Sequence, residues 1–267
     1  MRISKRATLL VAVTVVCIVA ALLVPPIAQP LHYHRFADSR AFLGIPNFGD
    51  AASNAAFFIV GLAGFVIVFR HRAAFERDSE RWPYATFFAG LVLTAFGSGY
   101  YHLAPDNGRL FWDRLPMTIA FAGLVAGQIS DRISVRAGVA LLVPMMFVGM
   151  ASVVFWRATE LAGHGNLVPY AVVQGYTMLV LILIASLWPS RYTRGRDLLY
   201  VFGWYALAKV CETFDRGIFE IGHVVSGHTL KHLFAALSGV AACVMLARRR
   251  RLFGDDSVVL ESRAAVT

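Results

Sequence analysis

The sequence predicts an all-α protein, a polytopic membrane helix bundle with a seven-helix core and one extra N-terminal helix. Hydrophobic residues make up 58% of the 267 residues and charged residues only 15%, whereas soluble domains carry about 25% charged residues. Apolar runs of roughly 20 residues, long enough to cross a bilayer as helices, recur along the chain. Because lipid cannot satisfy backbone N–H and C=O groups, these runs are expected to be helical.

The first apolar run extends from about Ala7 to Val24 and follows a basic start. A signal peptide has such a charged start and apolar centre, and a retained helix is the alternative. We favour the helix, because the run is long for a signal peptide and Pro25-Pro26 follows without a small-x-small cleavage site. Residues 1–24 are therefore expected to form a transmembrane helix or uncleaved signal anchor.

The rest of the chain divides into a polar loop, a helical core and a short tail. The loop covers 25–50, the core 51–247 and the tail 248–267. No internal repeat or low-complexity linker separates parts of the core. Apolar segments of the core are expected near 51–70, 84–103, 113–130, 136–156, 167–188, 197–215 and 228–247.

Basic residues lie mainly in the loops that eight helices would place on one side. The formal charge of +9 is thus interpreted as a topology signal, with no nucleic-acid partner. The positive-inside rule puts both termini in the cytoplasm, with 25–50 and the ends carrying His102, Asp113 and His228 on the outer, periplasmic or lumenal, side. The basic loops are 70–83, 131–136, 189–197 and the tail from Arg248 to Arg251.

Histidines with helical spacing are the candidate metal ligands. His228 and His232 are spaced i, i+4, a known way for one helix to supply two zinc ligands. A third imidazole from another helix would leave an open position for water, as catalytic zinc sites do. Ser98 and His102 share the same spacing, and Asp113 returns to the same surface after a short loop. The competing interpretation is that the spacing arises by chance and that each histidine only packs within the bundle. Ionisable groups clustered in membrane segments, however, usually face the bundle interior or a cavity.

These motifs together resemble the alkaline ceramidase family. Its pattern is similar to Ser98-x3-His102, then Trp112-Asp113-Arg-Leu-Pro-Met117, then His228-x3-His232. The family belongs to a wider group of seven-helix membrane hydrolases and receptors that includes the adiponectin receptors. The resemblance covers about 50–70, 95–120 and 228–240, in the right helix order.

The resemblance implies a membrane-embedded, zinc-dependent amidase that hydrolyses the N-acyl bond of ceramide-like lipids to a fatty acid and an amine. By this likeness His102, His228 and His232 would bind Zn²⁺. Ser98 and Asp113 would be the catalytic residues beside the water that zinc activates. Asp113 could accept a proton from that water, and Ser98 could donate to the developing oxyanion. The partners implied are a lipid amide and the membrane.

The chain departs from the family pattern in two places. Arg114 follows Asp113 where the family has Glu. The family also has an acidic Ca²⁺-binding cluster before its first core helix, and here only Asp38, Asn47 and Asp50 lie in that region. Calcium is retained as a second candidate ion, although we favour Asn47 and Asp50 as caps of the helix starting near Ala51.

Two other functions remain open at this stage. One is a receptor or sensor in which zinc is structural, although little extramembrane sequence is available for signalling. The other is a serine hydrolase using Ser98, His102 and Asp113, which would leave His228 and His232 without a role. Lys209, Glu212 and Asp215 are expected either to support the metal or to form an internal ion pair.

Overall fold

The computed structural model describes residues 4–252, and this part of the chain is helical apart from loops and two isolated β-bridges. The all-α expectation is confirmed. The α-helices are α1 (Lys5–Leu23), α2 (Phe48–Ser53), α3 (Ala55–Arg70), α4 (Arg81–Leu103), α5 (Asn107–Arg132), α6 (Val135–Leu161), α7 (Val168–Leu187), α8 (Leu198–Thr213), α9 (Asp215–Gly222) and α10 (Gly227–Arg248).

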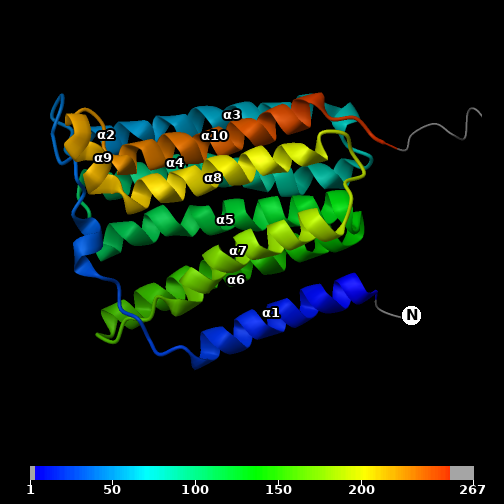
Figure 1. Cartoon of the computed structure of the whole chain (residues 1–267), viewed down its shortest axis with the longest axis horizontal. Helices are drawn as coiled ribbons and strands as arrows, with labels where there is room; N and C mark the ends of the chain where they lie inside the picture. Colours follow the sequence, from blue (N-terminus) through cyan, green and yellow to red (C-terminus); the bar gives the residue numbers. More distant parts are fainter. Residues whose placement is uncertain (1–3, 253–267) are drawn as a thin grey trace, which may run out of the picture.

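The long helices run side by side in one bundle (Figure 1). Helices α2 and α3 continue each other across Asn54, whose side-chain amide donates to the Asp50 carbonyl at 2.8 Å. By length and composition, five helices could cross a membrane: α1, α2–α3 taken together, α6, α7 and α10. This composition fits a multi-pass membrane protein, without fixing the number of core spans at seven.

Helix α1 lies on the outside of the bundle. None of its residues is buried, and it packs along α7, where the hydroxyls of Thr14 and Tyr176 are 2.7 Å apart. The other long helices contact one another around a shared apolar core. Helix α1, which was expected as an extra N-terminal helix, is therefore peripheral to this core.

Close packing of α4 on α5 positions the candidate site. A Cβ at Gly97 would lie 2.0 Å from the Trp112 carbonyl oxygen, and one at Gly123 would lie 2.4 Å from the Phe87 nitrogen. Small residues allow membrane helices to approach this closely. The contact at Gly97 brings the end of α4, with Ser98 and His102, against the start of α5, with Asp113.

The helix starts near the site are capped by side chains, but not by the residues expected for α2. Asp106 accepts from the Arg109 nitrogen at the start of α5, and Ser226 accepts from the Thr229 nitrogen at the start of α10. Asn47 has a left-handed backbone and makes no side-chain cap. The expectation that Asn47 and Asp50 cap this helix is wrong, because both side chains bond to distant segments.

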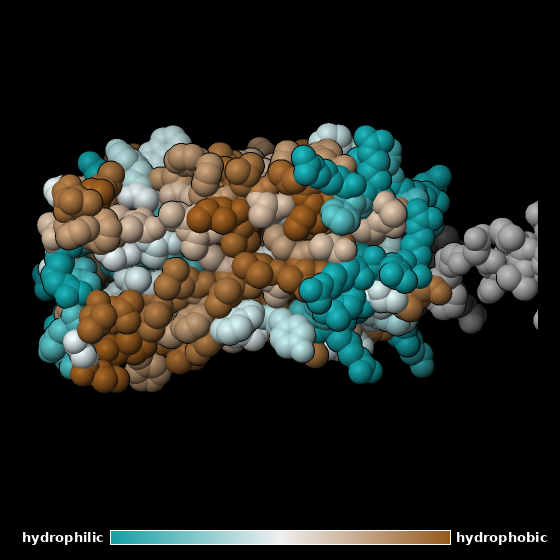
Figure 2. Space-filling model, turned by 90° about the horizontal axis from the view of Figure 1, so that it is seen from above, coloured by the Kyte–Doolittle hydropathy of each residue, from teal (hydrophilic) through white to brown (hydrophobic). Residues whose placement is uncertain are grey.

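The two ends of the bundle differ in character. The first and last described residues lie at the same end, whereas α2, α9 and the start of α10 lie at the other (Figure 1). On the face seen in Figure 2, hydrophilic residues gather strongly at the end where α10 finishes, and hydrophobic residues cover much of the middle. Most of the tail predicted at 248–267 lies outside the described residues.

Candidate metal centre

Three imidazoles from two helices meet near the end of the bundle that contains α2 and α9. The rings of His102, His228 and His232 have centroids 4.9 Å apart in each pair. One nitrogen from each ring lies within 4.8 Å of the others, and all three residues are buried. Two nitrogens on one tetrahedral zinc ion are about 3.4 Å apart. A small inward movement of the rings would complete the coordination, so the group could hold a metal ion.

The hydrogen bonds of Ser53 fix the orientation of His232. The Ser53 hydroxyl donates to the Asp50 carbonyl at 3.0 Å and lies 2.8 Å from His232 Nδ1. A hydroxyl has one proton, so it accepts from Nδ1–H and leaves the Nε2 lone pair free. His232 Nε2 is buried without a hydrogen-bond partner. An outer partner of this kind is the usual way in which a ligating histidine is oriented.

His102 also has a ring nitrogen that no protein group satisfies. Its Nδ1 is buried without a hydrogen-bond partner, and its backbone carbonyl accepts from the Asn47 side chain at 2.8 Å. Buried polar atoms without partners are rare in folded proteins and call for an explanation. A metal ion bound between His102 and His232 would explain both orphan nitrogens.

Asp215 hydrogen-bonds to the backbone of His228, and the Lys231 side chain lies close to its ring. Asp215 accepts from the His228 backbone nitrogen at 2.8 Å and from the Ala37 nitrogen at 2.9 Å. Lys231 Nζ lies 3.2 Å from His228 Nε2. His228 can therefore bind a metal either through Nδ1, or through Nε2 after the Lys231 side chain has moved away.

The polar loop before α2 covers the imidazoles. The Phe36 ring lies against two of them, with centroid distances of 4.7 Å to His102 and 4.5 Å to His228. His34 hydrogen-bonds with the Tyr101 hydroxyl. Asp38 pairs with Arg40, which donates to the carbonyls of His223 and Val224. The Arg40 guanidinium holds the pKa of the Asp38 carboxyl below its ordinary value.

The predicted catalytic pair lies on a cavity that also reaches the metal centre. Ser98, Asp113 and His232 line this cavity of about 280 Å³, which is near the lower end of the range for small-molecule sites. Both side chains are buried, Ser98 near the end of α4 and Asp113 near the start of α5. The remainder of the cavity is largely apolar and is lined by residues such as Phe57, Phe87, Leu91, Phe121 and Phe202.

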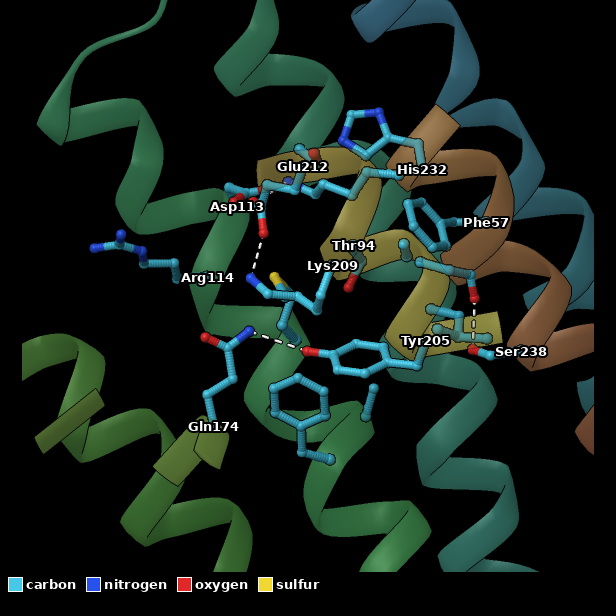
Figure 3. A pocket seen from close by; sticks show the side chains of 18 of the residues that line it. Phe57, Thr94, Asp113, Arg114, Gln174, Tyr205, Lys209, Glu212, His232 and Ser238 are labelled. Carbon is cyan, nitrogen blue, oxygen red and sulfur yellow. Dashed lines mark hydrogen bonds and ion pairs between the residues drawn. The ribbon is translucent and has the colours of Figure 1, made fainter. Parts of the chain in front are cut away.

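A group of three charged side chains lines the same cavity (Figure 3). Glu212 pairs with Lys209 and, at 3.0 Å, with Lys231. The sequence predicted that Lys209, Glu212 and Asp215 either support the metal or form an internal ion pair, and the structure shows the ion pair for Lys209 and Glu212. Asp215 is separate, since its carboxylate accepts only from backbone nitrogens.

The three side chains considered for calcium have different partners. Asp38 bonds to Arg40, and the Asn47 amide donates to a carbonyl. Asp50 accepts from Ser226 and Thr229. Among residues 4–252, the histidine group is the one cluster of three or more His, Cys, Asp or Glu side chains with metal-binding geometry.

Sequence reasoning missed three residues that contact the metal centre, namely Phe36, Ser53 and Lys231. Lys231 carried a signal, because a lysine within an apolar helix calls for a buried partner or a cavity. Phe36 and Ser53 carried none, since each contact joins segments far apart in sequence. No family model matches the chain, and no curated protein matches it either.

Proposed function

We propose that this protein is a membrane-embedded, zinc-dependent amidase that hydrolyses the N-acyl bond of ceramide-like lipids. The observation that carries the proposal is the convergence of His102, His228 and His232 beside a cavity lined by Ser98 and Asp113. Three nitrogen ligands with an open fourth position are typical of catalytic zinc. The motif likeness to alkaline ceramidases supports the same assignment.

The donor set fits zinc better than it fits calcium or magnesium. Imidazole nitrogens suit Zn²⁺, whereas Ca²⁺ and Mg²⁺ prefer oxygen ligands. Zinc would supply a Lewis acid that makes water nucleophilic near neutral pH. Asp113 would accept the proton from the attacking water, and Ser98 would donate to the oxygen that gains negative charge. The carbonyl carbon gains an oxygen, its bond to nitrogen breaks, and the amine leaves with a proton.

The cavity suits the two ends of a lipid amide. Its apolar part, with Leu91, Phe121 and Phe202, would hold the acyl chain. Its polar part, with Asp113 and His232, would surround the amide bond. The reaction would yield a fatty acid and an amine. The apolar part of the cavity would exclude water from around the acyl chain.

The proposal includes an orientation in the membrane. Both termini would lie in the cytoplasm and the metal centre near the outer surface, because the basic loops favour that arrangement. A protease-sensitive tag placed after Thr267 should be cut only after the membrane is opened. Cleavage in intact cells or right-side-out vesicles would reverse the assignment.

The direct test is incubation of the purified protein with a panel of N-acyl lipids. We expect released fatty acid from the wild type and a loss of at least a hundredfold in kcat for Asp113→Asn, with the zinc content retained. Ser152→Ala, which removes a hydroxyl bonded only to the Gly149 carbonyl, is the matched control.

Two results would favour the alternatives. Bound zinc without hydrolysis of any lipid amide would favour a receptor or sensor with a structural metal. Labelling of Ser98 by a fluorophosphonate, with activity unaffected by chelators, would favour a serine hydrolase.

A further inference from the structure

The polar part of the cavity carries more positive than negative side chains. Its lining includes three cationic residues, Arg114, Lys209 and Lys231, and two carboxylates, Asp113 and Glu212. A charge without a partner is costly inside a membrane protein. The imbalance therefore calls for one negative charge from a bound molecule.

The two lysines share a single carboxylate. Glu212 lies between Lys209 and Lys231, and its Oε1 is 3.0 Å from Lys231 Nζ. The Tyr33 hydroxyl also donates to Glu212 Oε1, at 3.4 Å. In Figure 3, Asp113, Lys209 and Glu212 lie together near His232. Among the described residues, Glu212 is the one carboxylate that forms an ion pair with these ammoniums, of which Lys231 is mostly buried and Lys209 about half exposed.

Arg114 does not neutralise the group. Its guanidinium points away from the middle of the cavity (Figure 3) and lies over the rings of Trp156 and Tyr170, with 4.5 Å and 4.9 Å to the ring centroids. Its Nη2 donates to Gln29 at 2.7 Å, and its Nη1 is buried without a partner. Aromatic faces and an amide thus hold this cation, and it adds to the positive potential.

Nearby carboxylates outside the lining do not remove the excess. Asp50 accepts from Ser226 and Thr229, and Asp215 from two backbone nitrogens. If one of these carboxylates is added to the sum of charges around the cavity, a divalent cation bound by the histidines would make the net charge positive again. The polar part of the cavity is therefore suited to an anion.

The position of Lys231 indicates which part of a substrate would carry the charge. Its ammonium is 3.2 Å from a ring nitrogen of His228, so it lies next to the reacting centre. The acyl chain would occupy the apolar part of the cavity, on the other side of the amide bond. A negative group within a few atoms of the amide nitrogen would reach Lys231 and Lys209.

We propose that the preferred substrates are N-acyl lipids whose amine half carries one negative charge, as in N-acyl amino acids, and that Lys209 and Lys231 recognise this charge. This inference rests on the amidase proposal but shifts its substrate class, because the amine half of a ceramide carries no negative charge. Water adds to the acyl carbon and the carbon–nitrogen bond breaks. The products are a fatty acid and an amino acid or aminosulfonate.

The test compares two pairs of substrates, each with one acidic and one neutral member on the same acyl chain. N-oleoylglycine is paired with N-oleoylglycinamide, and N-oleoyltaurine with N-oleoylethanolamine. We expect kcat/KM for each acidic member to exceed that of its neutral partner at least tenfold. Lys209→Met and Lys231→Met should each lower this ratio at least tenfold, with zinc content unchanged. Arg216→Met, which removes an exposed cation on α9, should leave the ratio as it is.

Several outcomes would overturn the inference. Neutral substrates cleaved as well as acidic ones would do so, as would an unchanged ratio in both lysine variants. A preference for N-oleoylglycine without one for N-oleoyltaurine would also count against it, because a carboxylate can chelate the metal directly and a sulfonate does so poorly.

A binding measurement separates this inference from the amidase proposal. If neither these four amides nor a ceramide is hydrolysed, the amidase proposal fails. N-oleoyltaurine should still raise the Tm of the purified protein more than N-oleoylethanolamine does, and Lys209→Met should abolish the difference. Equal shifts for the two lipids would show that the lysines do not recognise the charge.

Discussion

Removing the Ser53 hydroxyl should weaken metal binding without unfolding the protein. Ser53 accepts from His232 Nδ1 at 2.8 Å and donates to the Asp50 carbonyl. Ser53→Ala leaves His232 free to rotate or to adopt the other tautomer. Loss of such an outer hydrogen bond typically costs about 10–100-fold in metal affinity, which corresponds to about 1.4–2.7 kcal/mol.

The assay is a chelator titration of the zinc-loaded protein, followed by metal analysis. Ser53→Ala should release zinc at a chelator concentration at least tenfold lower than the wild type. Ser53→Thr, which keeps a hydroxyl, should recover most of the affinity, and Ser152→Ala should resemble the wild type. If Ser53→Ala retains zinc as tightly as the wild type, the assigned tautomer and the role of Ser53 are both wrong.

Three further predictions concern the loop over the site and the helix contact beneath it. Phe36→Ala removes the ring that covers His102 and His228, so it should speed the release of zinc to a chelator at least threefold. An unchanged release rate would show that Phe36 does not limit access of the chelator to the metal. Asp38 has a lowered pKa beside Arg40, so its pairing stabilises the folded state above the unfolded pKa of about 3.9 and loses this effect as pH falls through the lower folded pKa. The Tm deficit of Asp38→Asn should therefore be greatest at pH 7 and shrink below about pH 4. The deficit should be small, because the exposed Arg40 side chain is screened by solvent, and a deficit that does not change with pH would contradict the pairing. Gly97→Ala puts a Cβ 2.0 Å from the Trp112 carbonyl oxygen and should lower the free energy of unfolding by about 1–3 kcal/mol. A Cβ at Gly99 has no heavy atom within 4 Å, so Gly99→Ala should stabilise α4 by about 0.5–1 kcal/mol. Equal effects of the two changes on Tm would contradict the packing of α4 on α5.

The all-α fold could be predicted from sequence because apolar length is a local signal, and five of the helices are long and apolar enough to cross a membrane. The same holds for the pairing of His228 with His232, since i, i+4 spacing fixes one face of a helix. The prediction that His102 joins this pair came from the likeness to a family motif, because no local sequence pattern indicates contact between α4 and α10. The structure brings the three imidazoles together.

Errors and omissions arose where distant contacts decide the outcome. Asn47 and Asp50 have the side chains expected of helix caps, yet Asp50 is buried and bonded to Thr229, 179 positions away. Ser53 reaches His232 over the same sequence distance. Helix α9 was not expected, because the break at Phe214 falls inside a run predicted as a single helix to 215. Loop positions such as Phe36 have no periodicity from which a contact could be inferred.

Metal analysis of the purified protein tests the central claim most directly. We expect about one zinc per chain in the wild type, and less than a tenth of that in His102→Ala, His228→Ala and His232→Ala. His164→Ala, which changes an exposed loop histidine, should keep the full amount. Zinc retained at the wild-type level when His102 is replaced would contradict a centre built from two helices.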